Sequence, residues 1–381
     1  MFQLLKTDSA SRARLGSLTT AHGVVATPAF MPVGTQGTVK AMDPRELGEV
    51  GAQIILGNTY HLNLRPGLEI IRKAGGLHPF IAWPHPILTD SGGYQVFSLA
   101  KLAKIHDDGV AFQSHLDGAA LFLGPKEAMA IQRDLASDIA MVFDDCPPYP
   151  ASEERVAEAV ARTLRWARTC REQPRAAGQL VFGIGQGGVF DAQRVRCLEE
   201  LIKLDFDGYA IGGLSVGEPE VDLLRAAEIS APLLPADKPR YAMGVGTPAQ
   251  LVAMVVRGVD MFDCVLPTRM ARHGTAYTMR GTLSMKASAC RDDFRPIEEG
   301  CACFACRHFT RAYLRHLLHA NEILGVRMLT VHNLHLYLEL MRQMRGALQE
   351  GNFAQWRERF AEGCAQEEGE GGCACQIEPA P

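Results

Sequence analysis

The stretch LVFGIGQGGVFDAQRVRCLEELIKLDFDGYAIGG, residues 180–213, contains two short apolar segments on either side of an amphipathic one. Residues 180–186 and 208–213 are almost continuous apolar runs, which are typical of strands buried on both faces of a parallel sheet. Residues 190–204 carry apolar side chains three and four positions apart, which predicts a helix. The stretch therefore predicts two parallel strands joined by a right-handed crossover helix.

The same pattern extends along most of the chain. A second amphipathic helix is predicted at 152–173, and Thr247-Pro248 has the composition of a helix N-cap followed by proline in the first turn. Further apolar runs occur at 29–33, 52–58, 86–90, 139–145, 240–246 and 261–267. Eight strands that alternate with helices predict the α/β class and a (β/α)8 TIM barrel, with a doubly wound sheet as the alternative.

Two stretches interrupt this alternation. Residues 109–123 alternate apolar and polar side chains around Asp117-Gly118, which predicts a β-hairpin inserted after the third strand. The segment after the eighth strand holds a group of cysteines and many basic residues. We therefore expect the barrel in residues 1–269, a basic zinc-binding subdomain in 270–332, a helical part that packs on the barrel in 333–363, and a disordered acidic tail in 364–381.

Composition limits the class of protein. The 381 residues are 47% hydrophobic and 22% charged, as in soluble globular proteins. No run of about 18 apolar residues predicts a membrane span, and residues 1–16 lack the apolar core of a secretory signal, so we expect a cytoplasmic protein with reduced cysteines. Net charge is −4, but nine Lys/Arg against four Asp/Glu lie between Arg269 and Ala320. This basic stretch is either a phosphate-binding surface or an ordinary solvated one.

Cys301, Cys303 and Cys306 form a C-x-C-x-x-C group that can reach one ion. Structural zinc sites take four ligands, so a fourth ligand must come from elsewhere in the chain. His332 is favoured, because a turn at Gly325 would let it open a second helix after a first helix at 307–324. Other histidines in range are His308, His316, His319 and His335. Four protein ligands would make the ion structural rather than catalytic, and free thiols are the alternative.

Polar residues follow several of the predicted strands, where barrel enzymes carry their catalytic groups. A single aspartate at such a place can equally be a helix N-cap, but several carboxylates and an amide at one barrel mouth predict an active site. The residues concerned are Asp90, Asp144, Asp145, Gln186, Gly212, Gly213, Met243, Gly244 and Asp263. Residues 182–188 are glycine-rich, but no acid ends the next strand, so nicotinamide chemistry is set aside.

Seven motifs occur in order along the chain: DSGGYQVFSL (90–99), MVFDDCPPYP (141–150), FGIGQGG (182–188), GGLSVGE (212–218), YAMGVGTP (241–248), DMFDCVLPTRMARHGTAYT (260–278) and CACFAC with a later histidine. Together they closely resemble the bacterial tRNA-guanine transglycosylases, from about residue 10 to about residue 350. The resemblance implies a (β/α)8 barrel with a zinc-binding insertion. It implies exchange of guanine at the wobble position of tRNAs with GUN anticodons (Asp, Asn, His and Tyr) for preQ1, 7-aminomethyl-7-deazaguanine. This is a step of queuosine biosynthesis that uses no nicotinamide or ATP.

The resemblance also implies roles for single residues. Asp263 is expected to be the nucleophile and Asp90 the general acid/base that takes a proton from the incoming base, in a double displacement through a covalent enzyme–tRNA intermediate. The residues expected to bind the base are Ser91, Gly92, Gly93, Tyr94, Asp144, Gln186, Gly213 and Met243. Asp144 would accept from N1–H and N2–H, Gln186 and the Gly213 N–H would meet O6, and Tyr94 and Met243 would sandwich the base.

The resemblance also implies contacts with tRNA, with a metal ion and with a second subunit. The segments that resemble tRNA-contacting ones comprise Gly244, Val245, Gly246, Thr247, Pro248, Ala249, Gln250, Thr268, Arg269, Met270, Ala271 and Arg272. The resemblance implies one structural Zn²⁺ per subunit on Cys301, Cys303, Cys306 and His332, and a homodimer formed partly through the zinc insertion.

Cys146 and Val216 match forms that use preQ1 rather than queuine. Gly185 and Asp145 depart from the usual glutamine and glutamate.

Three alternatives to this function would require other features of the sequence. A non-catalytic tRNA-binding subunit of the same fold would lack the carboxylates that Asp90, Asp144 and Asp263 supply. An archaeal relative that modifies a different tRNA position would carry an extra RNA-binding region after the end of this sequence. A zinc-dependent hydrolase would need an open metal position, which a Cys3His site does not offer.

Overall fold

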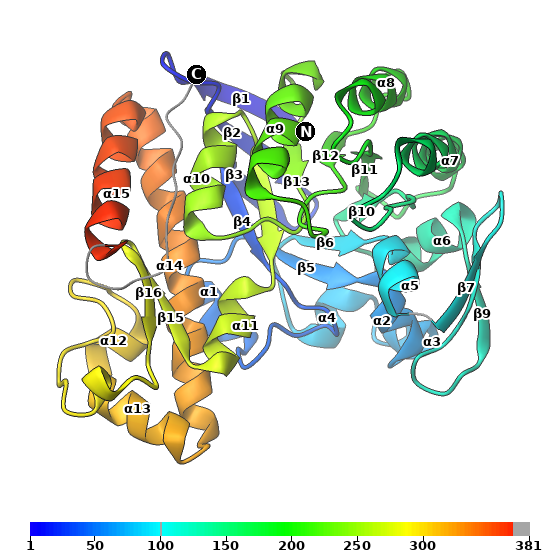
Figure 1. The fold of residues 1–381 in the computed structure, drawn as a ribbon. Coiled ribbons are helices and arrows are strands. Elements are labelled where there is room, and N and C mark those ends of the chain that lie inside the picture. Colours follow the sequence, from blue (N-terminus) through cyan, green and yellow to red (C-terminus); the bar gives the residue numbers. More distant parts are fainter. Residues whose placement is uncertain (100, 369–381) are drawn as a thin grey trace.

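The computed structural model describes residues 1–99 and 101–368. Its centre is a parallel sheet in the order β5-β6-β10-β11-β12-β13-β14-β4. A parallel bridge between Val33 and Leu56, with the Gly34 N–H 2.7 Å from the Leu56 carbonyl oxygen, joins the two edge strands. The sheet is therefore a closed barrel (Figure 1), and the doubly wound alternative is wrong.

Each of the eight predicted apolar runs contains one barrel strand. The strands are β4 (Ala29–Pro32), β5 (Ile55–Asn58), β6 (Ile87–Asp90), β10 (Ile139–Met141), β11 (Leu180–Gly185), β12 (Gly208–Ile211), β13 (Arg240–Ala242) and β14 (Met261–Cys264). All residues of β5, β10, β12 and β13 are buried, as expected for strands covered on both faces.

Helices surround the barrel, and the predicted helix starts are confirmed. Ser152 caps α7, and the Thr247 and Gln250 side chains form a reciprocal capping box at the start of α10, with Pro248 in its first turn. The helices of this part are α1 (Pro44–Glu49), α2 (Thr59–Leu64), α3 (Leu68–Lys73), α4 (Leu77–Ile81), α5 (Gly93–Leu99), α6 (Pro125–Leu135), α7 (Glu153–Arg171), α8 (Asp191–Ile202), α9 (Glu220–Leu233), α10 (Pro248–Val256) and α11 (Leu266–His273).

An antiparallel sheet of β1 (Phe2–Thr7), β2 (Arg14–Thr20) and β3 (Gly23–Thr27) precedes the barrel, and the sequence analysis did not anticipate it. Arg14 on β2 donates to the buried Asp260 carboxylate at 2.6 and 3.1 Å. Because Asp260 directly precedes β14, this ion pair joins the sheet to the amino-terminal end of the barrel. The opposite, carboxyl-terminal end stays open for a site.

The predicted hairpin at 109–123 is confirmed as β8 (Val110–Gln113) and β9 (Ala120–Leu123). A further strand, β7 (Lys101–Ile105), pairs with β8 to make a three-stranded sheet. The hairpin loop returns toward the barrel, since His115 Nδ1 lies 2.7 Å from the Tyr60 hydroxyl on α2. The insertion thus contacts the segment that follows β5.

After the barrel, the chain forms a subdomain at one side of the molecule (Figure 1). Its elements are β15 (Thr275–Thr278), β16 (Gly281–Ser284), the 3-10 helix η1 (Ser288–Cys290), α12 (Phe304–His308), α13 (Arg311–His319), α14 (Ile323–Glu350) and α15 (Phe353–Glu368). The single helix predicted at 307–324 is wrong. Phe309 is extended, and the Thr310 side chain caps a new helix, α13, by accepting from the Tyr313 N–H.

The turn predicted at Gly325 is also wrong. Asn321, with φ of 55°, makes the turn, and Gly325 lies inside the first turn of α14. A Cβ on Gly325 would lie 3.0 Å from the Leu317 Cβ, so glycine allows α14 to pack closely on α13. One helix, α14, therefore spans the boundary predicted at residue 332.

The predicted acidic tail is described only in part. Helix α15 continues to Glu368, so its last five residues, which were expected to be disordered, are helical. Residues 369–381, with Cys373 and Cys375, lie outside the described residues. Within residues 1–99 and 101–368, no helix is both long enough and apolar enough to cross a membrane.

Candidate active site

A cavity of about 490 Å³ opens at the carboxyl-terminal ends of the barrel strands. It collects most of the residues that the sequence singled out at strand ends, which confirms that they share one site. The predicted residues that line it are Asp90, Tyr94, Asp144, Gln186, Gly212, Gly213, Met243, Gly244, Gly246, Gln250, Asp263 and Arg269.

Asp263 lies near the end of β14 and is held by two donors. The Tyr241 hydroxyl is 2.5 Å and the Gly244 N–H is 2.8 Å from Asp263 Oδ1. Burial raises the pKa of Asp263, and both hydrogen bonds oppose that rise by stabilising the charged form. No hydrogen bond to Oδ2 is found among the described residues, so this oxygen remains available to a reacting atom.

Asp90 ends β6, directly beside Asn58 at the end of β5. Asn58 Nδ2 donates to Asp90 Oδ2 at 3.2 Å, while Asn58 Oδ1 accepts from the His61 N–H and caps α2. The Asn58 amide is therefore fixed at both ends. Burial, and secondly the charge of Asp263, raise the pKa of Asp90 to about 6. The charge of Asp263 therefore acts on Asp90, and the two carboxylates line the same cavity.

Asp144 and Gln186 form a polar edge on another wall of the cavity. Gln186 Nε2 donates to Asp144 Oδ2 at 2.6 Å, and Gln186 Oε1 is buried with no hydrogen-bond partner among the described residues. Burial raises the pKa of Asp144 to about 7, and the bond from Gln186 opposes the rise. Gly213 approaches so closely, at φ of 65°, that a Cβ there would lie 2.6 Å from Gln186 Oε1. Only glycine leaves this edge open to a ligand.

Close contacts in the loop after β6 require glycine at two positions. Gly92 has φ of 85°, and a Cβ there would lie 2.9 Å from the Tyr60 Cβ. A Cβ on Gly93 would lie 3.0 Å from the Asp144 carbonyl oxygen. Ser91 is buried, and its Oγ accepts from the Gly93 N–H at 3.3 Å. This tight turn leaves the Tyr94 side chain 46% exposed.

The segments predicted to contact tRNA are only partly exposed. The buried side chains among them are those of Val245, Pro248, Ala249, Thr268 and Ala271. Arg269 and Arg272 are exposed, and Gly244, Thr247, Gln250 and Met270 are half-buried, while Gly246 is buried. Arg269 and Arg272 are thus the only exposed residues of these two segments.

Several residues around the cavity were missed by sequence reasoning. Asn58 ends a predicted strand, and this position was the available signal for it. Tyr241 opens the motif at 241–248, but nothing in that motif indicated its contact with Asp263, and Arg194 carried no signal, because both contacts depend on neighbouring strands and loops. Arg194 on α8 is 2% exposed and donates to carbonyl oxygens of Gly188, Gly212 and Gly213.

Of the four residues that bear on base selectivity, two line the cavity and two do not. Cys146 and Val216 line the cavity, and burial raises the pKa of Cys146 to about 12, so its thiol is neutral. Asp145 is buried against α7, where Arg155 and Arg162 donate to its carboxylate. A Cβ on Gly185 would lie 2.3 Å from Leu198 Cδ2 on α8, which is outside the cavity.

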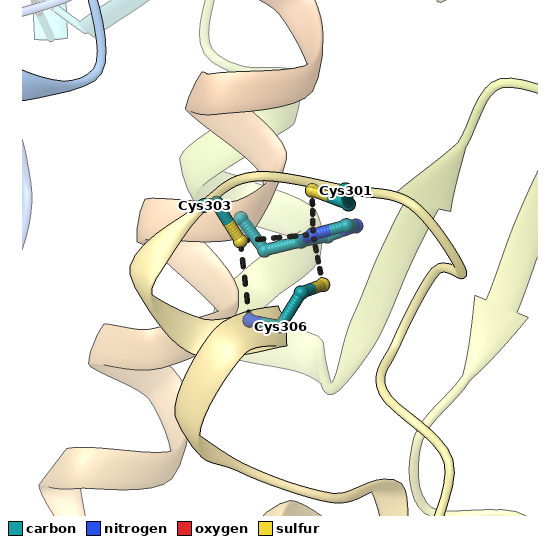
Figure 2. A group of neighbouring side chains, drawn as sticks. Cys301, Cys303 and Cys306 are labelled. Carbon is teal, nitrogen blue, oxygen red and sulfur yellow. Dashed lines mark hydrogen bonds between the residues drawn. The ribbon is translucent and has the colours of Figure 1, made fainter.

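The cysteine group and His332 come together as predicted. Figure 2 shows Cys301, Cys303 and Cys306 pointing toward one another from the loop and helix α12. His332 Nδ1 lies 3.8, 3.5 and 3.4 Å from their respective Sγ atoms. Tetrahedral zinc with ordinary bond lengths places sulfur and nitrogen about 3.6 Å apart, so the donor set and spacing fit Zn²⁺.

The second nitrogen of His332 is also engaged. Nε2 lies 2.7 Å from the Tyr277 carbonyl oxygen on β15, which leaves Nδ1 free of a proton and directed at the sulfurs. His332 belongs to the middle of α14 rather than to its start. An ion on these four ligands would join the α12 loop, α14 and β15, and would have no open position for a substrate.

A second group of metal-ligand type, His22, His78 and Asp138, is at the other end of the barrel. The two imidazole rings stack 3.6 Å apart at 19°. His22 Nδ1 lies 2.9 Å from one Asp138 oxygen, and His78 Nε2 lies 3.0 Å from the other. Parallel rings direct their nitrogens side by side rather than at one point. We therefore interpret this group as a hydrogen-bond network beneath the barrel.

The fold and the cavity together define a (β/α)8-barrel protein of the enzyme class, with Asp90, Asp263 and the Asp144–Gln186 edge in one cavity at the carboxyl-terminal ends of the strands. A family model described as queuine tRNA-ribosyltransferase matches residues 8–366. The chain therefore belongs to this family of transferases, and the resemblance to tRNA-guanine transglycosylases is confirmed.

Individual relatives agree with the family model. A queuine tRNA-ribosyltransferase from Moorella thermoacetica is 56% identical over 366 residues, which are 95% of this chain and 98% of the relative. One from Pelotomaculum thermopropionicum is 55% identical over 359 residues, which are 94% and 97% of the two chains. One from Listeria monocytogenes is 55% identical over 362 residues, which are 95% and 96%.

Proposed function

We propose that this protein is a tRNA-guanine transglycosylase that exchanges guanine at the wobble position of GUN-anticodon tRNAs for preQ1. The observation that carries the proposal is the pairing of Asp90 and Asp263 in one cavity with the Asp144–Gln186 edge. Two carboxylates serve a glycosyl displacement, and the edge serves base recognition. The alternative of a non-catalytic subunit is disfavoured, because all three carboxylates line the cavity.

The first displacement would start from Asp263 Oδ2. This oxygen attacks C1′ of the ribose, the C1′–N9 bond breaks, and its electron pair leaves with the guanine. The guanine then takes up a proton, which Asp90 would supply. With a pKa of about 6, Asp90 can give and accept a proton near neutral pH. The product is a ribosyl ester of Asp263.

The second displacement would reverse these roles. Asp90 removes the N9 proton of preQ1, N9 attacks C1′, and the Asp263 carboxylate leaves with the electron pair of the ester bond. Two inversions at C1′ restore the β configuration, as in retaining glycosidases. Tyr241 and Gly244 stabilise the returning carboxylate by their hydrogen bonds to Oδ1.

The polar edge fits a guanine-like base in the orientation that the resemblance implies. The Asp144 carboxylate accepts from N1–H and N2–H, while Gln186 and the Gly213 N–H meet O6. Tyr94 and Met243 both line the cavity and would enclose the faces of the base. Choice of preQ1 over queuine would follow from Val216, because its branched side chain occupies space that a bulky substituent at position 7 would need.

Binding of tRNA would use the exposed guanidinium groups of Arg269 and Arg272 for phosphates. The target nucleotide must leave its stack to enter the cavity. Zn²⁺ on the Cys3His site would be structural, with tetrahedral ligation by Cys301, Cys303, Cys306 and His332. We further propose a cytoplasmic homodimer, because the resemblance implies dimerisation through the zinc-binding subdomain.

The test is an exchange assay with the purified protein and unmodified tRNA of GUN anticodon, without ATP. Labelled guanine and preQ1 should be incorporated, queuine should not, and a tRNA with another anticodon should remain unlabelled. Protein with Asp263→Asn should give no covalent adduct on a denaturing gel. Absence of any exchange by folded, zinc-loaded protein would overturn the function, and incorporation of queuine would overturn the choice of base.

A further inference from the structure

Arg194 carries a buried guanidinium group that has no part in the proposed reaction steps. Its residue exposure is 2%, and no carboxylate lies within ion-pair distance of it among the described residues. Burial lowers its pKa to about 10, so it remains charged at neutral pH. A buried charge without a counter-ion is costly unless it is fully hydrogen-bonded, which indicates that its position serves a purpose.

Among the described residues, Arg194 makes three hydrogen bonds, all to backbone carbonyls of the two loops proposed to bind the base. Nε donates to the Gly188 oxygen at 2.6 Å in the loop after β11. Nη1 donates to the Gly212 oxygen at 3.2 Å, and Nη2 to the Gly213 oxygen at 3.3 Å, in the loop after β12. From α8, one side chain thus links the loop that carries Gln186 with the loop that carries Gly213.

The bond to the Gly212 oxygen has a further consequence. The Gly212 C=O and the Gly213 N–H belong to the same peptide plane, and in a trans peptide they point in opposite directions. A guanidinium that holds the oxygen on the α8 side therefore turns the N–H toward the cavity. There the Gly213 N–H interacts with the thiol of Cys146, which lines the cavity.

The surrounding glycines fit the same arrangement. A Cβ on Gly187 would lie 2.4 Å from Arg194 Cγ, so only glycine admits the side chain beneath the loop. Gly213 has φ of 65°, a conformation that a flexible glycine would readily leave without restraint. Arg194 supplies that restraint by bonding both carbonyls of the Gly212–Gly213 pair.

We propose that Arg194 is a positioning residue that orients and polarises the Gly213 N–H toward O6 of the purine. This inference rests on the proposed function. When the C1′–N9 bond breaks, its electron pair enters the purine, and O6 carries part of the negative charge. A peptide with a cation at its oxygen is a stronger donor at its N–H, so Arg194 stabilises this charge without touching the base.

The test compares Arg194→Met with Arg194→Lys. Guanine and 6-thioguanine, which keeps N1–H and N2–H but replaces O6 by the weaker acceptor sulfur, are measured as competitors of labelled guanine exchange. Arg194→Met should raise the inhibition constant of guanine about tenfold, as expected for one hydrogen bond, and that of 6-thioguanine less than about threefold. Arg194→Lys, which keeps the charge but can reach fewer carbonyls, should lie between Arg194→Met and wild type.

Arg240→Met is the matched control. Arg240 is also buried and donates to two backbone carbonyls, of Leu234 and Gly258, but it starts β13 at the other end of the barrel. The Arg240→Met substitution should leave the ratio of the inhibition constants of guanine and 6-thioguanine unchanged. An equal rise for both bases in Arg194→Met, or no rise in folded Arg194→Lys and Arg194→Met, would overturn the proposal. Failure of the wild-type protein to exchange guanine would instead overturn the function itself.

Discussion

Replacing Tyr241 by Phe should trap more of the protein as the covalent adduct. The Tyr241 hydroxyl donates to Asp263 Oδ1 at 2.5 Å, and the Gly244 N–H remains as the second donor. In the proposed mechanism the free enzyme holds Asp263 as a carboxylate, whereas the adduct holds it as a neutral ester. A hydrogen bond to a charged acceptor is worth about 1.5–3 kcal/mol and one to a neutral acceptor about 0.5–1.5 kcal/mol.

Loss of the hydroxyl therefore costs the free carboxylate about 1–1.5 kcal/mol more than it costs the ester. This difference shifts the equilibrium between free enzyme and adduct about five- to twelvefold toward the adduct. The size of the effect depends on Asp263 being the group that changes charge, and not on the overall rate of the reaction.

The assay titrates free guanine against preformed adduct and measures the adduct left on a denaturing gel. The guanine concentration that removes half of the adduct should rise about five- to twelvefold in Tyr241→Phe. Tyr209→Phe is the control, because the Tyr209 hydroxyl is also hydrogen-bonded, to Phe206 and Ile202, but away from the cavity. A half-point within twofold of wild type, in folded protein, would refute the assigned role of Asp263 or of its donor.

Three further outcomes are expected. Burial raises the pKa of Asp144 to about 7, so its ionisation lowers stability progressively as the pH rises from about 4 to about 7, and the full cost remains at higher pH; Asp144→Asn should raise the melting temperature at pH 8.5 more than at pH 5.5 while weakening base binding. Cys306→Ala should remove about one zinc per chain by metal analysis and weaken tRNA binding, and retained zinc would contradict the ligand set. Burial would raise the pKa of Asp138, but bonds from His78, the Ile87 amide and His22 lower it to about 2. Its carboxylate should contribute about 2 kcal/mol of stability above pH 4 that is lost as the pH falls through 2, and Asp138→Asn should abolish this pH dependence in urea unfolding.

Much of the fold could be predicted because its pattern is local. Each barrel strand lies within an apolar run, since a strand covered on both faces must be apolar throughout. Asp90, Asp144 and Asp263 stand out because each follows such a run, and barrel topology brings strand ends together. The cysteine spacing predicts a metal-binding site, because three thiolates within six residues can reach one ion.

The helices after the barrel show where local pattern fails. Helical periodicity continues through Phe309, but the Thr310 cap breaks the helix there. The glycine at position 325 predicts a turn, yet it lies within α14. Because it has no Cβ, the Leu317 side chain can pack closely against it. The Thr310 cap is a local signal that competes with the helical periodicity, whereas Gly325 is decided by a contact between two helices.

The sequence by itself determined the positions of the barrel strands, the carboxylates at their ends and the three-cysteine part of the metal-ligand group, because burial and ligand chemistry leave patterns within short segments. Only the tertiary structure decided which groups tune them. Asn58 reaches Asp90, and Tyr241 reaches Asp263, because neighbouring strands lie side by side. Arg194 reaches two loops at once because α8 packs beneath both of them. Hydrogen-bond partners of this kind depend on the arrangement of elements in space, which no local pattern records.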